Sequence, residues 1–258
     1  MNIAVITGAS SGMGKEFVMQ LDKEKEYDEI WVIARRKERL EELQKLVRSK
    51  IVPISLDLTK QESIEEYAEI LNKQNPNVIT LVNASGFGRF GSFESLKLEE
   101  QLEMIDLNAK ALVSITHKTL PYMTKGAEIY QLDSQSSFQP LPYLNVYAAT
   151  KAFVLSYSRS LSVELKPKGI KVLAVCPGWV KTEFFDRAKT DDTLTYFYKT
   201  FTADQIIKKA IKDMKKGKDV SVYGLSTKCL VLLAKILPHK LVMKIWCKQQ
   251  KQMYKRRL

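Results

Sequence analysis

A serine, a tyrosine and a lysine stand at a spacing that suits proton transfer. Ser134 is followed by Tyr147 and, four positions later, by Lys151. Four residues make about one turn of an α-helix, so the phenol and the ammonium can serve one reacting centre. A phenol has a pKa of about 10, and a neighbouring cation lowers it. By itself the pair also fits a packed tyrosine beside a surface lysine; with Ser134 it indicates acid–base chemistry at a carbonyl or alcohol oxygen.

The segments that must position these residues alternate along the chain. Runs rich in Ile and Val, several of them continuous, are typical of strands buried on both faces of a parallel sheet. Segments with helical spacing separate them, which predicts a doubly wound α/β fold with a seven-stranded parallel sheet. The predicted strands cover residues 3–6, 30–34, 51–56, 78–82, 129–132, 172–175 and 220–223. The predicted helices cover residues 15–21, 38–47, 63–71, 98–120, 143–165 and 203–214.

Composition limits the class of protein. A chain of 258 residues with 45% hydrophobic residues can form one α/β domain with a substantial core. The three cysteines and two histidines stand too far apart in sequence to indicate a zinc site or a disulfide framework, so we expect no metal. Strand-like sequence from Asn2 leaves no room for a secretory signal, and we expect a cytoplasmic protein.

The net charge of +12 is concentrated near the C-terminus. Residues 1–207 carry 26 Lys and Arg against 27 Asp and Glu, whereas residues 208–258 carry 15 against two. A neutral body disfavours nucleic-acid binding. Residues 229–234 are apolar but too few to span a bilayer. The lysines that follow recur at intervals of three and four, which predicts a basic amphipathic helix: Lys240, Lys244, Lys248, Lys251 and Lys255.

Several roles stay open for this helix. It can pack on the body with a solvated lysine face, lie on an anionic membrane surface as a peripheral contact, cover a substrate cleft or form a subunit contact.

A glycine-rich turn follows the first predicted strand. Glycines at positions 8, 12 and 14 allow a tight turn and let an anion such as a pyrophosphate approach the next helix, whose dipole favours it. The spacing differs from the commoner Gly-x-Gly-x-x-Gly. Its position directly after the first strand favours a dinucleotide site over a plain structural loop.

The end of the second predicted strand bears on the choice of cofactor. Proteins that bind NAD tend to place an acidic residue there, and its charge repels a 2′-phosphate. This chain has Ala34, then Arg35 and Arg36. A guanidinium offers a planar fork suited to phosphate. We therefore expect NADP(H), with Arg35 as the main contact and Arg36 as a second; solvated charge at a helix start is the alternative for Arg36.

Taken together, these residues resemble the short-chain dehydrogenase/reductase family, whose fold is Rossmann-like. The resemblance follows the family's order over roughly residues 1–215 and implies an NADP(H)-binding catalytic domain over residues 1–223 with a helical extension over residues 224–258. It rests on Gly8, Gly12 and Gly14, the turn Asn83-Ala84-Ser85-Gly86, Asn108, Ser134, Tyr147, Lys151, Pro177-Gly178 and Thr182.

The resemblance assigns roles to four catalytic residues. Tyr147 would be the general acid in reduction and the base in oxidation, and Ser134 would hold and polarise the carbonyl. Lys151 would lower the pKa of Tyr147 and bind the nicotinamide ribose. Asn108 would kink the fourth helix and hold, through its main chain, a water that links Lys151 to solvent.

The resemblance also implies binding residues. The expected cofactor contacts are Gly8, Ser10, Ser11, Gly12, Met13, Gly14, Arg35, Arg36, Asp57, Leu58, Asn83, Ala84, Ser85, Gly86, Tyr147, Lys151, Pro177, Gly178, Val180 and Thr182. The expected substrate contacts are Ser134, Ser136, Tyr143, Tyr147, Phe184 and Phe185. Two positions depart from the family pattern: Ala84, where a second asparagine is common, and Asp133, where a small or hydroxyl residue is more usual.

Aromatic residues near the motif turns favour an apolar substrate. The sequence thus predicts NADP(H)-dependent interconversion of a ketone and a secondary alcohol, with hydroxysteroid- or bile-acid-like compounds ranked first and 3-oxoacyl compounds second. The resemblance implies a homodimer or homotetramer. The alternative is an NADPH-binding sensor or scaffold that docks on a membrane or partner through its cationic tail. The substitution Tyr147→Phe separates the two hypotheses: if the protein is an enzyme, the variant loses turnover of ketones but still binds NADPH.

Overall fold

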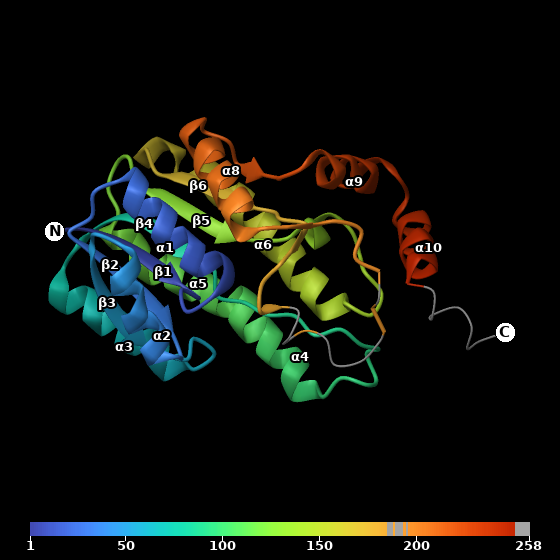
Figure 1. Cartoon of the computed structure of the whole chain (residues 1–258), viewed down its shortest axis with the longest axis horizontal. Coiled ribbons are helices and arrows are strands. Elements are labelled where there is room, and N and C mark those ends of the chain that lie inside the picture. The colour runs from blue at the N-terminus through green and yellow to red at the C-terminus, as the bar shows by residue number, and fades with distance from the viewer. Residues whose placement is uncertain (185–187, 189–192, 195, 251–258) are drawn as a thin grey trace.

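The computed structural model describes residues 1–184, 188, 193–194 and 196–250 (Figure 1). Among these residues, seven parallel strands form one sheet in the order β3-β2-β1-β4-β5-β6-β9. The predicted doubly wound α/β fold is confirmed. The strands are β1 Asn2–Thr7, β2 Glu29–Ala34, β3 Lys50–Ser55, β4 Asn77–Asn83, β5 Glu128–Leu132, β6 Lys171–Val175 and β9 Val220–Ser221.

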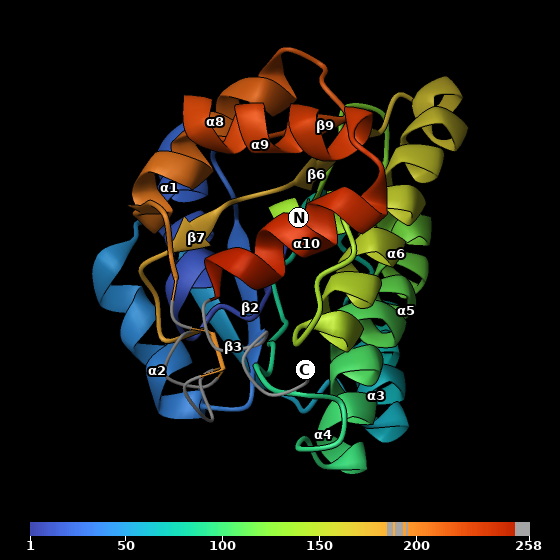
Figure 2. The same ribbon diagram turned by 90° about the vertical axis from the view of Figure 1, so that its right-hand side faces the viewer.

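Alternation along the first strand shows how the sheet buries both faces. Ala4 and Ile6 join a core cluster with residues of α1, α2 and α8, whereas Ile3 and Val5 join a second cluster with residues of α3, α5 and α6. Helices therefore cover the sheet on both sides (Figure 2). Their bounds are α1 Gly12–Glu24, α2 Lys37–Glu41, α3 Gln61–Gln74, α5 Leu112–Thr119, α6 Asn145–Glu164 and α8 Ala203–Lys215.

The helix predicted over residues 98–120 is divided into segments. α4 spans Leu98–Ile105, a π-helical segment, η2, spans Asp106–Ala111, and α5 continues the run. Asn108 lies in the π-helical segment, a form that often occurs at functional sites. Short 3-10 helices add η1 Glu42–Leu46, η3 Leu120–Tyr122, η4 Gln135–Phe138 and η5 Lys166–Lys168.

Beyond β6 the chain builds smaller elements near one end of the sheet. β7 Trp179–Val180 pairs in parallel with β8 Thr200–Phe201. After β9, the helices α9 Leu225–Ile236 and α10 His239–Gln249 lie at the right-hand end of Figure 1. None of the helices in the described part of the chain combines the length and apolarity needed to cross a bilayer.

Candidate active site

A cavity of about 620 Å³ opens at the carboxyl ends of the parallel strands. Its lining runs without interruption from Gly8, in the glycine turn after β1, past Tyr147 to Trp246 on α10. The carboxyl ends of strands are where open α/β sheets bind ligands. A dinucleotide and a second small molecule can therefore meet in one cavity.

The glycine turn packs against the turn after β4. At Gly8 (φ 68°), a Cβ atom would lie 2.7 Å from the main-chain carbon of Ala84. At Gly14, a Cβ atom would lie 2.2 Å from the carbonyl oxygen of Gly8. A side chain at either position would force the turns apart, so glycine keeps the cradle at the N-terminus of α1 narrow and its amides open to an anion.

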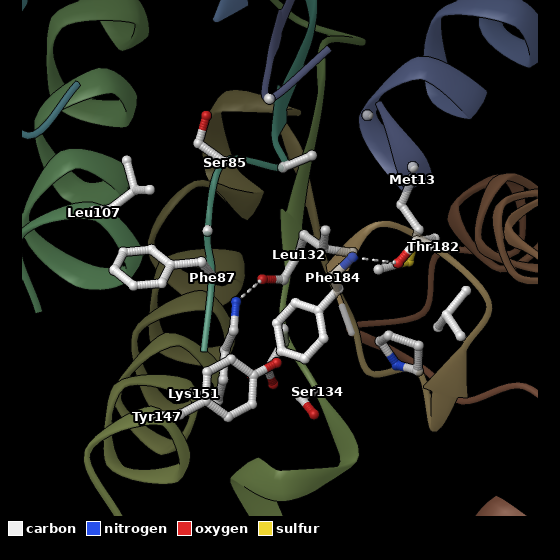
Figure 3. A pocket seen from close by; sticks show the side chains of 18 of the residues that line it. Met13, Ser85, Phe87, Leu107, Leu132, Ser134, Tyr147, Lys151, Thr182 and Phe184 are labelled. Atoms are coloured by element: carbon white, nitrogen blue, oxygen red, sulfur yellow. Dashed lines mark hydrogen bonds between the residues drawn. The ribbon is translucent and has the colours of Figure 1, made fainter. Parts of the chain in front are cut away.

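Ser134, Tyr147 and Lys151 come together in this cavity, as predicted (Figure 3). Ser134 follows β5, and α6 carries the other two. The side chain of Ser134 lies near the Tyr147 hydroxyl and acts to lower its pKa. The buried ammonium of Lys151 lies 5.7 Å from the centre of the Tyr147 ring and donates a 2.8 Å hydrogen bond to the carbonyl oxygen of Leu132.

Asn108 braces this group from behind the cavity. The fully buried amide donates through Nδ2 to the carbonyl oxygen of Phe87 at 2.8 Å and to Oγ1 of Thr150 at 3.1 Å. Its Oδ1 accepts from the Phe87 N–H at 3.0 Å. Asn108 therefore ties the segment after β4 to α6 between Tyr147 and Lys151; its proposed main-chain water stays a prediction.

The two arginines after β2 take different places. Arg36 donates through Nη2 to the hydroxyls of Ser10 and Ser11, at 3.0 and 3.1 Å, and so lies over the glycine turn. Its Nη1 donates to Glu183 at 3.0 Å. The half-exposed Arg35 lies 3.9 Å from Asp57. Arg36 was expected to be the second contact, but it is the arginine that hydrogen-bonds to the glycine turn, whereas Arg35 lies beside Asp57.

Comparison with known proteins identifies the family. The family model described as short chain dehydrogenase matches residues 2–193. The chain belongs to this family.

Relatives agree with the assignment. An NADP-dependent 3-hydroxy acid dehydrogenase of Escherichia coli O6:H1 is 33% identical and covers 74% of this chain and 78% of its own. A sulfoacetaldehyde reductase of Chromohalobacter salexigens is also 33% identical, over 71% of this chain and 74% of its own. A solved short-chain dehydrogenase from Sphingobium yanoikuyae, in complex with NADPH, is 26% identical with a TM-score of 0.77, covering 92% of this chain and 97% of that one.

In this short-chain dehydrogenase, burial sets the direction of the Tyr147 pKa shift. Burial of its hydroxyl raises the pKa and the charge of Asp133 adds to the effect, whereas the side chain of Ser134 acts to lower it; the lowering by Lys151 that the resemblance implies stays a prediction. Lys151 gives its hydrogen bond to Leu132 rather than to the phenol. Burial also lowers the pKa of Lys151, partly offset by the charge of Asp133.

Asp133, the departure from the family pattern, lies inside the protein. Only 2% of it is exposed, and its Oδ2 accepts a 3.2 Å hydrogen bond from the thiol of Cys176. Burial raises the pKa of this carboxyl to about 7, against the opposing charge of Lys151. The dehydrogenase therefore holds a second titratable group behind Ser134 and next to the catalytic candidates.

Most of the predicted cofactor contacts of this dehydrogenase line the cavity. Those that do are Gly8, Ser10, Ser11, Gly12, Met13, Gly14, Arg35, Arg36, Asp57, Leu58, Ala84, Ser85, Gly86, Tyr147, Lys151, Pro177, Gly178, Val180 and Thr182. Asn83 does not, because its amide turns inward and donates to Thr116 and Gln131, each at 3.0 Å. No group of three or more His, Cys, Asp or Glu among the described residues is arranged to hold a metal ion.

Four of the six predicted substrate contacts line the cavity. Ser134, Ser136, Tyr147 and Phe184 line the cavity. Tyr143 does not line the cavity itself but packs against an apolar cluster that forms part of the cavity wall, and Phe185 lies outside the described residues. Further residues that line the cavity beside these contacts were not predicted from the sequence to bind the substrate: Phe87, Phe90, Gln135, Gln139, Leu141, Leu144, Trp179 and Trp246.

Proposed function

We propose that this protein is an NADP(H)-dependent oxidoreductase that interconverts a ketone and a secondary alcohol on a hydrophobic substrate. Hydroxysteroid- or bile-acid-like compounds rank first and 3-oxoacyl compounds second. The observation that carries the proposal is the continuous cavity, with the glycine cradle at one end and Ser134 and Tyr147 beside an apolar end.

The cofactor is NADP(H). The narrow turn held by Gly8 and Gly14 suits a pyrophosphate, and Arg36 with Ser10 and Ser11 offers donors to a 2′-phosphate. The Sphingobium yanoikuyae structure in complex with NADPH and the NADP-dependent Escherichia coli relative support the choice. When bound, the cofactor supplies or accepts the hydride.

The chain's own residues handle the proton. Tyr147 donates it to the carbonyl oxygen in reduction and takes it back in oxidation, and Ser134 holds that oxygen by a hydrogen bond. Burial raises the free energy of the Tyr147 phenolate. The buried cation of Lys151 stabilises the phenolate by charge attraction after the proton has left. Asn108 fixes the segments from which these groups project.

The substrate end favours apolar ligands. Its lining includes the rings of Phe87, Phe90, Trp179, Phe184 and Trp246. Among the described residues that line this end, Lys151 is the only cation. Two relatives are named for small acidic substrates, a 3-hydroxy acid and sulfoacetaldehyde; the rings here suit a larger apolar ketone better.

A homodimer or homotetramer fits exposed apolar surface on two helices. Leu98, Leu102 and Ile105 are spaced along one face of α4 and are 60%, 49% and 43% exposed. Phe153 and Val163 on α6 are 47% and 70% exposed. Self-association over these helices would bury this surface. The cytoplasmic location and the boundary at residue 223 stay predictions.

A screen of hydroxysteroids and oxo-acids for change in NADPH absorbance tests the function. We expect turnover of at least one apolar ketone, and a loss of 10²-fold or more in kcat for Tyr147→Phe with NADPH binding retained. Tyr157→Phe, on the same helix, is the matched control and keeps its activity. A Tyr147→Phe variant with wild-type turnover would contradict the assignment, and NADPH binding without turnover of any compound would favour the sensor.

A further inference from the structure

The helix α9 exposes an apolar stripe. Leu225, Leu232 and Ile236 are 78%, 58% and 70% exposed, and their spacing of seven and four residues puts them on one face. Leu233 beside them is 49% exposed. The opposite face, with Val231, is buried against the body. Burying large aliphatic side chains is strongly favourable, so a continuous row of them in water indicates an interaction surface.

The helix α10 continues the pattern. Leu241 and Ile245, one turn apart, are 44% and 43% exposed, while Val242 and Trp246 are buried beneath them. Both helices lie on the side of the molecule that faces the viewer in Figure 2. We call the exposed residues Leu225, Leu232, Leu233, Ile236, Leu241 and Ile245 the apolar stripe.

Positive charge accompanies the apolar stripe. Exposed lysines stand beside it on both helices: Lys228, Lys240, Lys244 and Lys248. Residues 220–258 contain nine Lys and Arg and no Asp or Glu. The surface therefore combines exposed aliphatic side chains with cationic groups that have no acidic residue in their own segment.

We propose that α9 and α10 dock on an anionic phospholipid surface, with the apolar stripe in the acyl boundary and the lysines among the headgroups. A second copy of the same surface is a poorer partner, because pairing the two would oppose lysine to lysine. A nucleic acid would satisfy the lysines but leave the leucines and isoleucines in water.

Docking would also bring the cavity to the lipid. Trp246 lines the cavity from the inner face of α10, whose outer face carries Leu241 and Ile245. One helix, about 10 Å thick, therefore separates the substrate end from the docked surface. Given the proposed function, the enzyme would take an apolar ketone from the membrane in which it concentrates.

Co-sedimentation with vesicles tests the docking itself. We expect the full chain to pellet with phosphatidylcholine vesicles that contain 30% phosphatidylserine, and much less with pure phosphatidylcholine. Leu232→Ser/Ile236→Ser should weaken binding at least tenfold, and Lys240→Gln/Lys244→Gln/Lys248→Gln on the order of 100-fold. The matched controls are the exposed Leu46→Ser and the triple change Lys166→Gln/Lys168→Gln/Lys171→Gln, which should bind as wild type does.

The outcomes separate the alternatives. Absence of binding at low salt overturns the proposal, as does binding that the serine double variant leaves unchanged. Tighter binding to duplex DNA than to the vesicles would assign the surface to nucleic acid, and loss of self-association in the serine double variant would assign it to a second copy. Turnover of a water-soluble ketone without vesicles should be the same in all variants, so failure of docking and failure of the proposed activity are distinguishable.

Discussion

The side chain of Asn108 and the main chain of Phe87 form a closed pair of hydrogen bonds, with Nδ2 donating to the carbonyl oxygen at 2.8 Å and Oδ1 accepting from the N–H at 3.0 Å. A third bond reaches Thr150 on α6. Asn108, which lies in the π-helical segment between α4 and α5, thus fixes one wall of the cavity, because Phe87 lines it.

Replacing Asn108 by Ala should therefore cost both stability and turnover. The change removes three buried hydrogen bonds, two to the main chain of Phe87 and one to Thr150, although the Thr150 hydroxyl keeps its bond to the carbonyl oxygen of Tyr147. At about 1–3 kcal/mol for each buried bond before relaxation, we expect a loss of about 2–5 kcal/mol in the free energy of unfolding. Denaturant unfolding measures it. Asn77→Ala, which loses two exposed bonds, one donated to Asn2 and one accepted from Thr124, is the matched control. An Asn108→Ala variant that unfolds with the wild type would contradict the bracing role.

Arg36 should decide the preference for NADPH over NADH. It lies over Ser10 and Ser11, and hydrogen bonds to a charged group contribute about 1.5–3 kcal/mol. We expect Arg36→Ala to raise the KM for NADPH by about 10- to 100-fold and to leave the KM for NADH nearly unchanged. Arg35→Ala should have a smaller effect. Equal losses for both cofactors, or a larger effect at Arg35, would refute this order.

Glu183 should oppose cofactor binding. Its two carboxylate oxygens accept from Arg36 at 3.0 Å and from Arg39 at 2.6 Å, and these bonds hold the pKa of Glu183 below its usual range. A 2′-phosphate would compete with this carboxylate for Arg36. Glu183→Gln should therefore lower the Kd for NADPH by a few-fold, the scale of an exposed ion pair, without changing the Kd for NADH. Equilibrium fluorescence titration measures both constants.

The comparison for Glu183 is Glu41→Gln, which removes an exposed carboxylate beside Lys37 on the same helix as Arg39. This control should bind NADPH as the wild type does. Weaker NADPH binding by Glu183→Gln would show that the carboxylate organises the arginines for the phosphate instead of competing with it.

Local sequence signals predicted much of this site. The glycine turn, Ser134 and the helical pair Tyr147 and Lys151 depend on neighbours within a few residues, so their spacing was informative. Trp246 was not assigned, because its place in the cavity depends on how α10 folds back, with Nε1 donating to the carbonyl oxygen of Pro142 at 3.0 Å. The burial that raises the pKa of Tyr147 could not be predicted either, since burial is a property of the assembled core.

The buried carboxyl of Asp133 gives a pH dependence of stability. Its pKa is about 7 in the folded protein and 3.8 when unperturbed, so between these values the folded state holds a proton that the unfolded state has lost. Stability should therefore be greatest below about pH 4 with respect to this group. It should fall by about 1.4 kcal/mol per pH unit as pH rises toward 7, or about 4 kcal/mol in all.

Asp133→Asn removes this titration while keeping the size of the side chain. The free energy of unfolding of Asp133→Asn minus that of the wild type should become more positive from pH 4.5 to pH 7.5, by about 3–4 kcal/mol. Urea unfolding at several pH values measures the difference, with the exposed Asp219→Asn as control. A difference that stays constant across the range would mean that Asp133 ionises alike in the folded and unfolded chains, in spite of its burial beside Cys176 and Lys151.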